Sequence, residues 1–161
     1  MKKLAHFAIV LIMAYPITGL IISSCSDEAD CSLNGRSNLQ CYMYRLNESN
    51  NMVRDTLDSL TVTDFYTDSV IINNIKNVDY IELPLRYTVD STVFVMHYSR
   101  TIRDTIIVKH NNVPYFISMD CGYEMQQTIL ERKYTRHFID TIALRYNNAN
   151  NNGQENFRLI H

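Results

Sequence analysis

The sequence has no tryptophan, few glycines and prolines, and no cluster of basic residues. Without a basic patch, binding to nucleic acid loses its electrostatic basis. The sequence also lacks the G-x-S-x-G motif of serine hydrolases, the H-E-x-x-H motif of zinc peptidases and a glycine-rich phosphate loop. The histidines at positions 97, 110, 137 and 161 are scattered, so a catalytic or metal site would have to assemble from distant loops. We therefore expect no enzyme activity, no metal and no cofactor.

The longest apolar run lies at the N-terminus and is typical of a secretory signal peptide. Lys2 and Lys3 precede it, and it extends over residues 4–22 with interruptions at Pro16 and Gly19. A stable transmembrane helix needs about 20 apolar residues, and the proline and the glycine weaken this run as a permanent span. The run is therefore expected to be an export signal and not a lasting membrane helix.

The end of this run resembles a bacterial lipobox. The sequence Ile22-Ser23-Ser24-Cys25 offers an aliphatic residue and two small residues ahead of a cysteine, whose sulfur can carry a diacylglycerol through a thioether. Cleavage would remove residues 1–24 and leave Cys25 as the lipidated N-terminus, so that the protein is anchored to a membrane and does not span it. The simpler alternative is an ordinary signal peptide with a chance cysteine nearby.

The small and acidic residues that follow Cys25 resemble the export tag of surface lipoproteins in Bacteroides-type bacteria, although a solvated tether would have the same composition. They are Ser26, Asp27, Glu28 and Asp30. The expected location is therefore the outer membrane with the domain facing outward, and a periplasmic orientation stays open. The expected organisation is a signal peptide over residues 1–24, a lipid-anchored acidic tether over 25–38 and one domain over 39–161.

The mature chain would have 137 residues, because the signal peptide removes 24 of 161. It would carry 13 basic and 17 acidic side chains, a net charge of about −4. Its β-branched and aromatic residues recur in short runs separated by Asn, Asp, Ser and Gly. This pattern predicts an all-β fold, a single antiparallel β-sandwich of about eight or nine strands.

Three segments give strand predictions that a structure can check. The tripeptide His110-Asn111-Asn112 is predicted to be the turn of a hairpin between two strands. Pro84 predicts an edge strand or a break, because proline cannot donate to a strand ladder. Residues 123–136 could form a helix or a long strand, and strand is favoured because a short helix among hairpins would need its own packing partner.

Three cysteines remain after Cys25, an odd number for an oxidising compartment, so one disulfide and one free thiol is the simplest arrangement. In the loop-entropy model a bridge to Cys121 stabilises the fold by roughly 4–5 kcal/mol, against roughly 3 kcal/mol for Cys31–Cys41. Cys31 lies in an irregular stretch that can adapt to disulfide geometry, whereas Cys41 lies inside a predicted strand and can be buried. Cys31–Cys121 is therefore favoured, and Cys41–Cys121 is the alternative.

The order of several motifs after the lipobox and the acidic tag resembles an uncharacterised family of small lipoproteins from Bacteroides-type bacteria, a domain of unknown function. The motifs are DSLTV, LPLRY, PYFISMDCGYEM and YTRHFIDTI. The resemblance covers most of the mature chain and supplies no catalytic residues. It implies an anchored all-β domain in which an early cysteine pairs with the one before Gly122, here Cys31 with Cys121. Cys41 departs from the family pattern and puts this pairing in doubt.

A tripeptide of Asp, then Ser or Thr, then an aliphatic residue or Thr occurs six times. One explanation is structural, because Asp and Ser or Thr begin turns and an aliphatic residue opens the next strand. The tripeptide also resembles the O-glycosylation sequon of exported proteins in Bacteroides-type bacteria, and the two explanations are compatible. The possible acceptors are Thr56, Ser59, Ser69, Ser91, Thr105 and Thr141.

The expected function is that of a lipid-anchored outer-membrane lipoprotein with a structural or interaction role and no catalytic activity. The alternative is a surface glycan- or protein-binding accessory module of a larger envelope complex. In that case the tyrosines would have to supply the flat aromatic contacts that tryptophan usually makes, and ten of the eleven lie in the mature chain. The expected partners are the membrane, through the lipid anchor, and an envelope protein or glycan.

Overall fold

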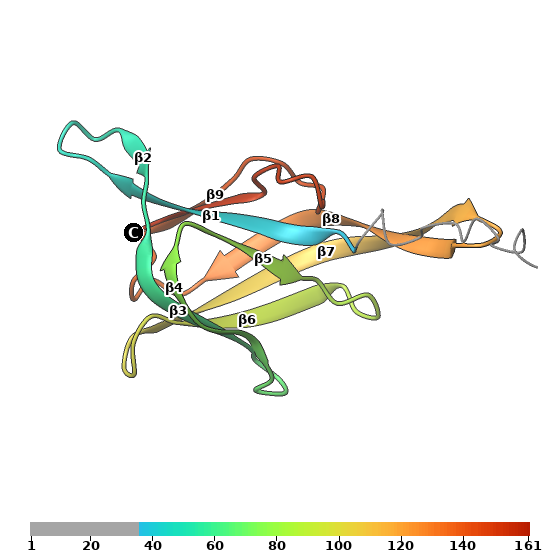
Figure 1. Cartoon of the computed structure of the whole chain (residues 1–161), viewed down its shortest axis with the longest axis horizontal. Coiled ribbons are helices and arrows are strands. Elements are labelled where there is room, and N and C mark those ends of the chain that lie inside the picture. The colour runs from blue at the N-terminus through green and yellow to red at the C-terminus, as the bar shows by residue number, and fades with distance from the viewer. Residues whose placement is uncertain (1–35) are drawn as a thin grey trace, which may run out of the picture. The chain divides into compact units, whose positions relative to one another are not determined.

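The computed structural model describes residues 36–161, which form ten strands in two facing sheets (Figure 1). The strands are β1 Asn38–Leu46, β2 Met52–Arg54, β3 Leu57–Asp64, β4 Val70–Val78, β5 Tyr80–Pro84, β6 Ser91–His97, β7 Arg103–Ser118, β8 Gly122–Tyr134, β9 Thr141–Leu144 and β10 Phe157–Ile160. The predicted all-β sandwich is confirmed, with ten strands in place of eight or nine. Within the described residues no helix is long and apolar enough to cross a bilayer.

The two sheets differ in how their strands are paired. One has the order β4-β3-β6-β7-β8 and is antiparallel throughout. The other has the order β2-β1-β10-β9, and β5 also pairs with β1. Its β1–β10 pair is parallel, with Cys41 opposite Phe157, so the sandwich is not purely antiparallel. The first and last strands of the described chain are therefore neighbours near the middle of one sheet.

A single apolar cluster fills the space between the sheets. Leu39, Cys41 and Met43 alternate along β1 and are almost fully buried, and Phe94 and Met96 do the same on β6. Strand side chains point to opposite faces in turn, so this period of two explains the pattern. Burying each large apolar side chain stabilises the fold by about 1.5–3 kcal/mol.

The predicted turn at His110-Asn111-Asn112 is wrong. These residues lie inside β7, which continues for 16 residues and stays paired with β8 on both sides of them. A two-residue hairpin turn needs positive φ angles. None of these three residues has one, whereas Asn50, Asp68, Asn74 and Asn77 do. The Asn-rich sequence here supplies hydrogen bonds to a neighbouring loop instead of a turn.

The other two segment predictions are confirmed. Residues 123–134 belong to the long strand β8, and β5 ends at Pro84. The register of β7 and β8 shifts between Lys109 and His110, where Glu131 and Ile129 are their partners. Leu130 is the extra residue of this bulge, and it is 66 % exposed.

The β7–β8 hairpin extends well beyond the sandwich (Figure 1). β6 pairs with β7 only from Arg103 to Lys109, whereas β8 accompanies β7 as far as Ser118. The outer half of the hairpin is thus a two-stranded ribbon. It closes in a turn over residues 119–121, after which Gly122 has a φ of 70°, a conformation that favours glycine.

Candidate functional site

The residues predicted to direct export and anchoring lie outside the described residues. They are Cys25, Ser26, Asp27, Glu28, Asp30 and Cys31. The structure therefore does not place them, and their roles stay predictions.

The two cysteines within the described residues are in different states. Cys41 is a free thiol buried in β1, and burial raises the pKa of this thiol. Cys121 lies in the turn of the long hairpin and is not among the free thiols. The alternative pairing of Cys41 with Cys121 is therefore wrong, because Cys41 occupies a core position between Leu39 and Met43.

The six possible acceptor hydroxyls lie at or near strand beginnings. Ser91 and Thr141 open β6 and β9, and Thr56 and Ser69 directly precede β3 and β4. Ser59 is the third residue of β3 and Thr105 is the third residue of β7, and both are partly buried. This placement agrees with the structural explanation of the tripeptides for four of the six.

A polar network lies at the end of the core from which the hairpin projects. Asn112 Nδ2 donates to the carbonyl of Val89 at 2.6 Å, so its Oδ1 accepts from His110 Nδ1 at 2.9 Å. The Arg86 N–H donates to Thr92 Oγ1, and that hydroxyl donates to His110 Nε2 at 2.9 Å. The bonds therefore fit a neutral imidazole with its proton on Nδ1. Burial lowers the pKa of His110, which also favours the neutral imidazole.

Asp64 ties the β3–β4 turn to the loop after β5. Its carboxylate accepts two bonds from Arg86 at 2.7 and 2.8 Å and two from the backbone N–H groups of Tyr66 and Thr67 at 2.9 Å. Burial acts to raise the pKa of Asp64, but these donors outweigh it and the pKa lies below its usual value. The Asp64–Arg86 ion pair therefore holds the turn and the loop together, since every donor to the carboxylate belongs to the protein itself.

Asp104 is fully buried and holds the connection between β8 and β9. It accepts hydrogen bonds from the backbone N–H groups of His137, Phe138 and Ile139 at 2.8–2.9 Å and from the Thr135 hydroxyl at 2.7 Å. Burial raises the pKa of Asp104, but these four donors lower it more, and the pKa lies below the usual range. Both oxygens of this carboxylate therefore accept two hydrogen bonds each from the protein itself.

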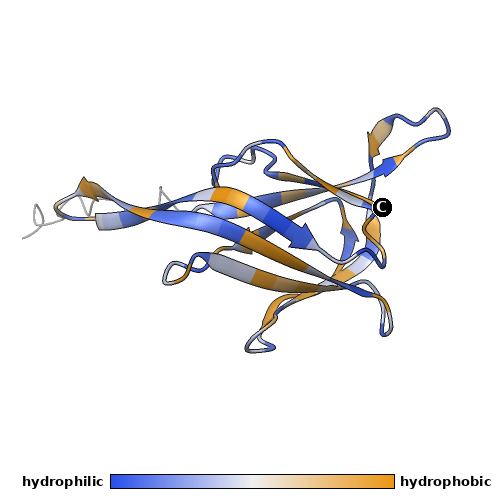
Figure 2. Cartoon of the chain, turned by 180° about the vertical axis from the view of Figure 1, so that it is seen from behind, coloured by the Kyte–Doolittle hydropathy of each residue, from blue (hydrophilic) through white to orange (hydrophobic). Residues whose placement is uncertain are grey.

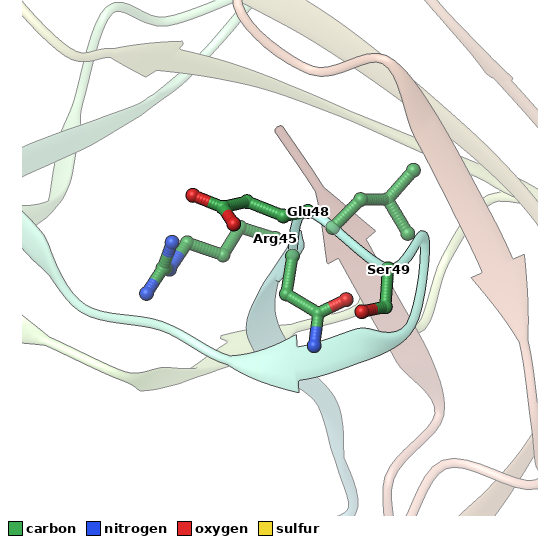
Figure 3. Close-up of a pocket in the computed structure, with 5 residues that line it drawn as sticks. Arg45, Glu48 and Ser49 are labelled. Atoms are coloured by element: carbon green, nitrogen blue, oxygen red, sulfur yellow. The ribbon is translucent and has the colours of Figure 1, made fainter.

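Several hollows lie on the surface formed by the described residues. One of about 410 Å³ lies at the β1–β2 turn, where Arg45 and Glu48 extend to the same side (Figure 3). Ser49 also lines it, but no histidine or cysteine does. Among residues 36–161 no group of three His, Cys, Asp or Glu side chains could hold a metal ion.

A tyrosine–arginine surface lies on the outer face of the sheet that contains β1. Tyr42 and Tyr80 are cross-strand partners whose rings stack at 5.5 Å between centroids. The Arg54 guanidinium lies 4.1 Å from the Tyr42 ring centroid, and Arg158 lies 4.9 Å from that of Tyr44. Tyr80 is 48 % exposed, so this surface could accept a planar or sugar-like ligand on one side.

Exposed apolar side chains gather on the outer half of the long hairpin. The most exposed are Met119 at 90 % and Tyr123 at 73 %, and Phe116 contacts Tyr123 edge-on at 5.4 Å. Figure 2 shows hydrophobic colouring at this far end. Apolar residues that are both clustered and exposed often mark an interaction site.

The fold and these surfaces define a small β-sandwich domain with a projecting hairpin. Residues 59–161 match a family of unknown function, DUF6452, and the chain belongs to this family. None of the curated proteins and none of the solved structures matches the chain. The match begins inside β3, so it leaves out β1 and β2.

Sequence reasoning did not identify the buried polar groups Asp64, Asp104 and His110 as structural centres. A signal for Asp64 existed, because it alternates with Leu60 and Val62 on the buried face of its strand. The exposed tip of the hairpin was also missed, because the predicted turn at His110 hid the length of β7. An uninterrupted strand of 16 residues cannot stay covered by a partner strand of seven residues.

Proposed function

We propose that this protein is a lipid-anchored outer-membrane lipoprotein whose β-sandwich has a structural or interaction role in the cell envelope. The observation that carries the proposal is the sequence Ile22-Ser23-Ser24-Cys25 at the end of an apolar run. Supporting it, the first strand begins at Asn38, only 13 residues after Cys25. A short acidic tether followed directly by a folded domain is the arrangement that a surface-attached module needs.

The non-enzymatic character is part of this proposal. The carboxylate oxygens of the two buried residues Asp64 and Asp104 accept hydrogen bonds from backbone N–H groups and, for Asp64, from an arginine. The buried histidine, His110, is bonded through both ring nitrogens to Thr92 and Asn112. Groups held in this way stabilise loops and are poorly placed to transfer protons to a substrate.

The proposed location is tested by fractionation and protease treatment of the cells that make the protein. The wild type is expected in the outer-membrane fraction, and protease added to intact cells should remove its domain. The matched control is Cys25→Ala, which keeps the signal peptide but lacks the acceptor sulfur and should leave the membrane fraction. Wild-type protein in the soluble fraction would contradict the anchor, and protection from protease until lysis would place the domain in the periplasm.

We also propose that Cys121 is paired with Cys31. This is supported by the buried free thiol of Cys41, which removes one competitor, and by the proposed use of Cys25 for lipid. In denaturant without reductant, an alkylating reagent should modify Cys41 alone. After reduction it should also modify Cys31 and Cys121. Modification of all three without reductant would contradict the pairing.

The alternative function, a glycan- or protein-binding accessory module, is favoured by the stacked pair Tyr42 and Tyr80. Aromatic rings beside an arginine can hold a sugar or a peptide side chain. If the surface binds glycan, Tyr80→Ala should weaken binding to an envelope glycan fraction at least tenfold, while the equally exposed Tyr146→Ala should not. Absence of binding by the wild type would remove this alternative.

The tripeptide hydroxyls remain proposed O-glycosylation sites. Thr56, Ser69 and Thr141 are the best supported, since they are exposed. Protein from its own cells should exceed in mass the protein made in a host that lacks the glycosylation pathway, after lipid is removed from both. Equal masses would end this proposal.

A further inference from the structure

We propose that the tip of the β7–β8 hairpin is a second contact with the bilayer that holds the Cys25 lipid, an inference that rests on the lipid anchor proposed above. The tip consists of Phe116, Met119 and Tyr123 around the turn over residues 119–121. It is the outermost part of the projecting ribbon (Figure 1).

One face of the ribbon is apolar on both strands. Residues directly opposite each other in an antiparallel pair point to the same face. Pro114 is opposite Met125, and Phe116 is opposite Tyr123, so these four side chains share a face. The other face is mixed, because it carries Val113 opposite Gln126 and Tyr115 opposite Glu124, and the second of these pairs is hydrogen-bonded. The apolar face therefore continues the buried face of β7 beyond the point where the second sheet ends.

The described chain begins next to this face. Arg36 lines a hollow of about 260 Å³ together with Pro114, Tyr123 and Met125. Its guanidinium lies 5.2 Å from the ring centroid of Tyr87. Residue 36 therefore lies beside the outer half of the hairpin, and the tether to Cys25 starts from there.

The length of the tether lets the tip reach the bilayer. Eleven residues separate Arg36 from Cys25, and they can span at most about 40 Å. From Met125 to the turn at Cys121 the ribbon advances four residues, or about 13 Å. The distance from the start of the tether to the tip is thus shorter than the greatest length of the tether, so the tip can reach the bilayer that holds the lipid. A bridge from Cys31 to Cys121 would shorten the connection between lipid and tip to six residues.

The chemistry of the tip fits a lipid headgroup region. Tyrosine is enriched at membrane interfaces, because its ring is apolar and its hydroxyl is polar. Phenylalanine and methionine side chains are stabilised when they are buried where the lipid headgroups meet the acyl chains. Asp120 and Glu124 lie in the same region and outnumber Arg36, so an anionic surface would not attract it. The partner is therefore a zwitterionic lipid surface, and the covalent anchor makes even weak partitioning effective by keeping the tip near it.

The sequence has no tryptophan, so the fluorescence of a single introduced tryptophan reports on its own position alone. The lipidated protein carrying Tyr123→Trp is reconstituted into phosphatidylcholine vesicles with or without brominated acyl chains. If the tip contacts the bilayer, its emission should be clearly weaker in brominated than in unbrominated vesicles. The matched control is Leu46→Trp, which is 48 % exposed and is the last residue of β1. The β1–β2 turn that follows it lies at the other end of the domain from the tip (Figure 1), so this variant should be unaffected. Adding Met119→Asp to the Tyr123→Trp variant should abolish the quenching.

Three results would overturn the proposal. Equal emission from Tyr123→Trp in both kinds of vesicle, with lipid on Cys25 shown by intact mass, removes the bilayer contact and leaves the anchor intact. Emission that is already blue-shifted without vesicles means that protein covers the tip. A dimeric mass by light scattering then identifies a second copy as the cover, and a monomeric mass identifies the chain's own N-terminal segment. Unmodified Cys25 in the intact mass ends both this proposal and the anchor.

Discussion

At the residue scale, the most demanding feature is the set of buried polar side chains whose partners are all internal. Asp104 shows how such a residue is tolerated, because four donors compensate for its removal from water. Three of these donors are consecutive backbone N–H groups of a connection that has no ladder of its own. Asp104 therefore shapes that connection and is not a surface acid at a strand beginning.

We predict that Asp104→Asn lowers the free energy of unfolding by about 3 kcal/mol at pH 7, because an amide turns one acceptor into a donor facing backbone N–H groups. The control is Asp58→Asn, at an exposed position on β3. Urea unfolding measures both. The pKa of Asp104 is lowered in the fold, so its contribution is present above the unfolded pKa of about 3.9 and is lost as the pH falls through the folded pKa. An unchanged midpoint in Asp104→Asn would contradict this account.

His110 also makes the stability depend on pH, but here the form that fits the fold is the neutral base and not a charged acid. Its folded pKa is lowered, so below pH about 6.5 the unfolded state binds a proton that the folded state does not. The wild type should therefore lose stability relative to His110→Gln as the pH falls from 7.5 towards 5. Urea midpoints for both proteins at several pH values measure this, and the control is His137→Gln, which replaces an exposed histidine. A difference that is constant with pH would show that His110 does not stay neutral.

At the scale of elements, the sequence predicts strands well where burial alternates and poorly where polar residues satisfy one another. The runs around Leu60 and Phe94 alternate clearly, and both are strands. His110-Asn111-Asn112 has the composition of a turn, yet its polar atoms are used by Thr92 and by the loop over residues 86–89. A local pattern cannot show a partner that is more than 15 residues away in the sequence.

The asparagines of β4 illustrate the same limit. Its segment NNIKN has the composition of a turn, but β4 runs through it to Val78 with positive φ at Asn74 and Asn77. Asparagine adopts the left-handed region more readily than most residues, so it permits irregular positions without ending the strand. The register shifts between β3 and β4 lie in this part of the sheet.

β1 is the element on which the second sheet depends, although the family match begins after it. It pairs with β2, β5 and β10 and contributes Leu39, Cys41 and Met43 to the core cluster. We predict that a chain of residues 59–161 does not fold cooperatively, whereas a chain of residues 36–161 does. Thermal unfolding followed by circular dichroism compares them, and a cooperative transition in the shorter chain would contradict the prediction.

At the scale of the whole molecule, the all-β sandwich could be predicted because composition and the spacing of apolar runs reflect the fold as a whole. The parallel β1–β10 pair could not, since it joins residues more than 100 positions apart. The candidate surfaces could not be predicted either, because exposure of Met119 and Tyr123 depends on how far β7 and β8 extend past their neighbours. Membership of a family of unknown function adds no reaction to this picture.

The account of this protein as an anchored envelope module depends on the chemistry of Cys25. The most direct measurement is the intact mass of the protein purified in detergent from the cells that make it, with Cys25→Ala as the control. We predict a chain that begins at Cys25 and carries the added mass of a diacylglycerol with its fatty acids, and this mass should be absent from the control. A wild-type chain that retains residues 1–24, or whose Cys25 carries no lipid, would contradict the account.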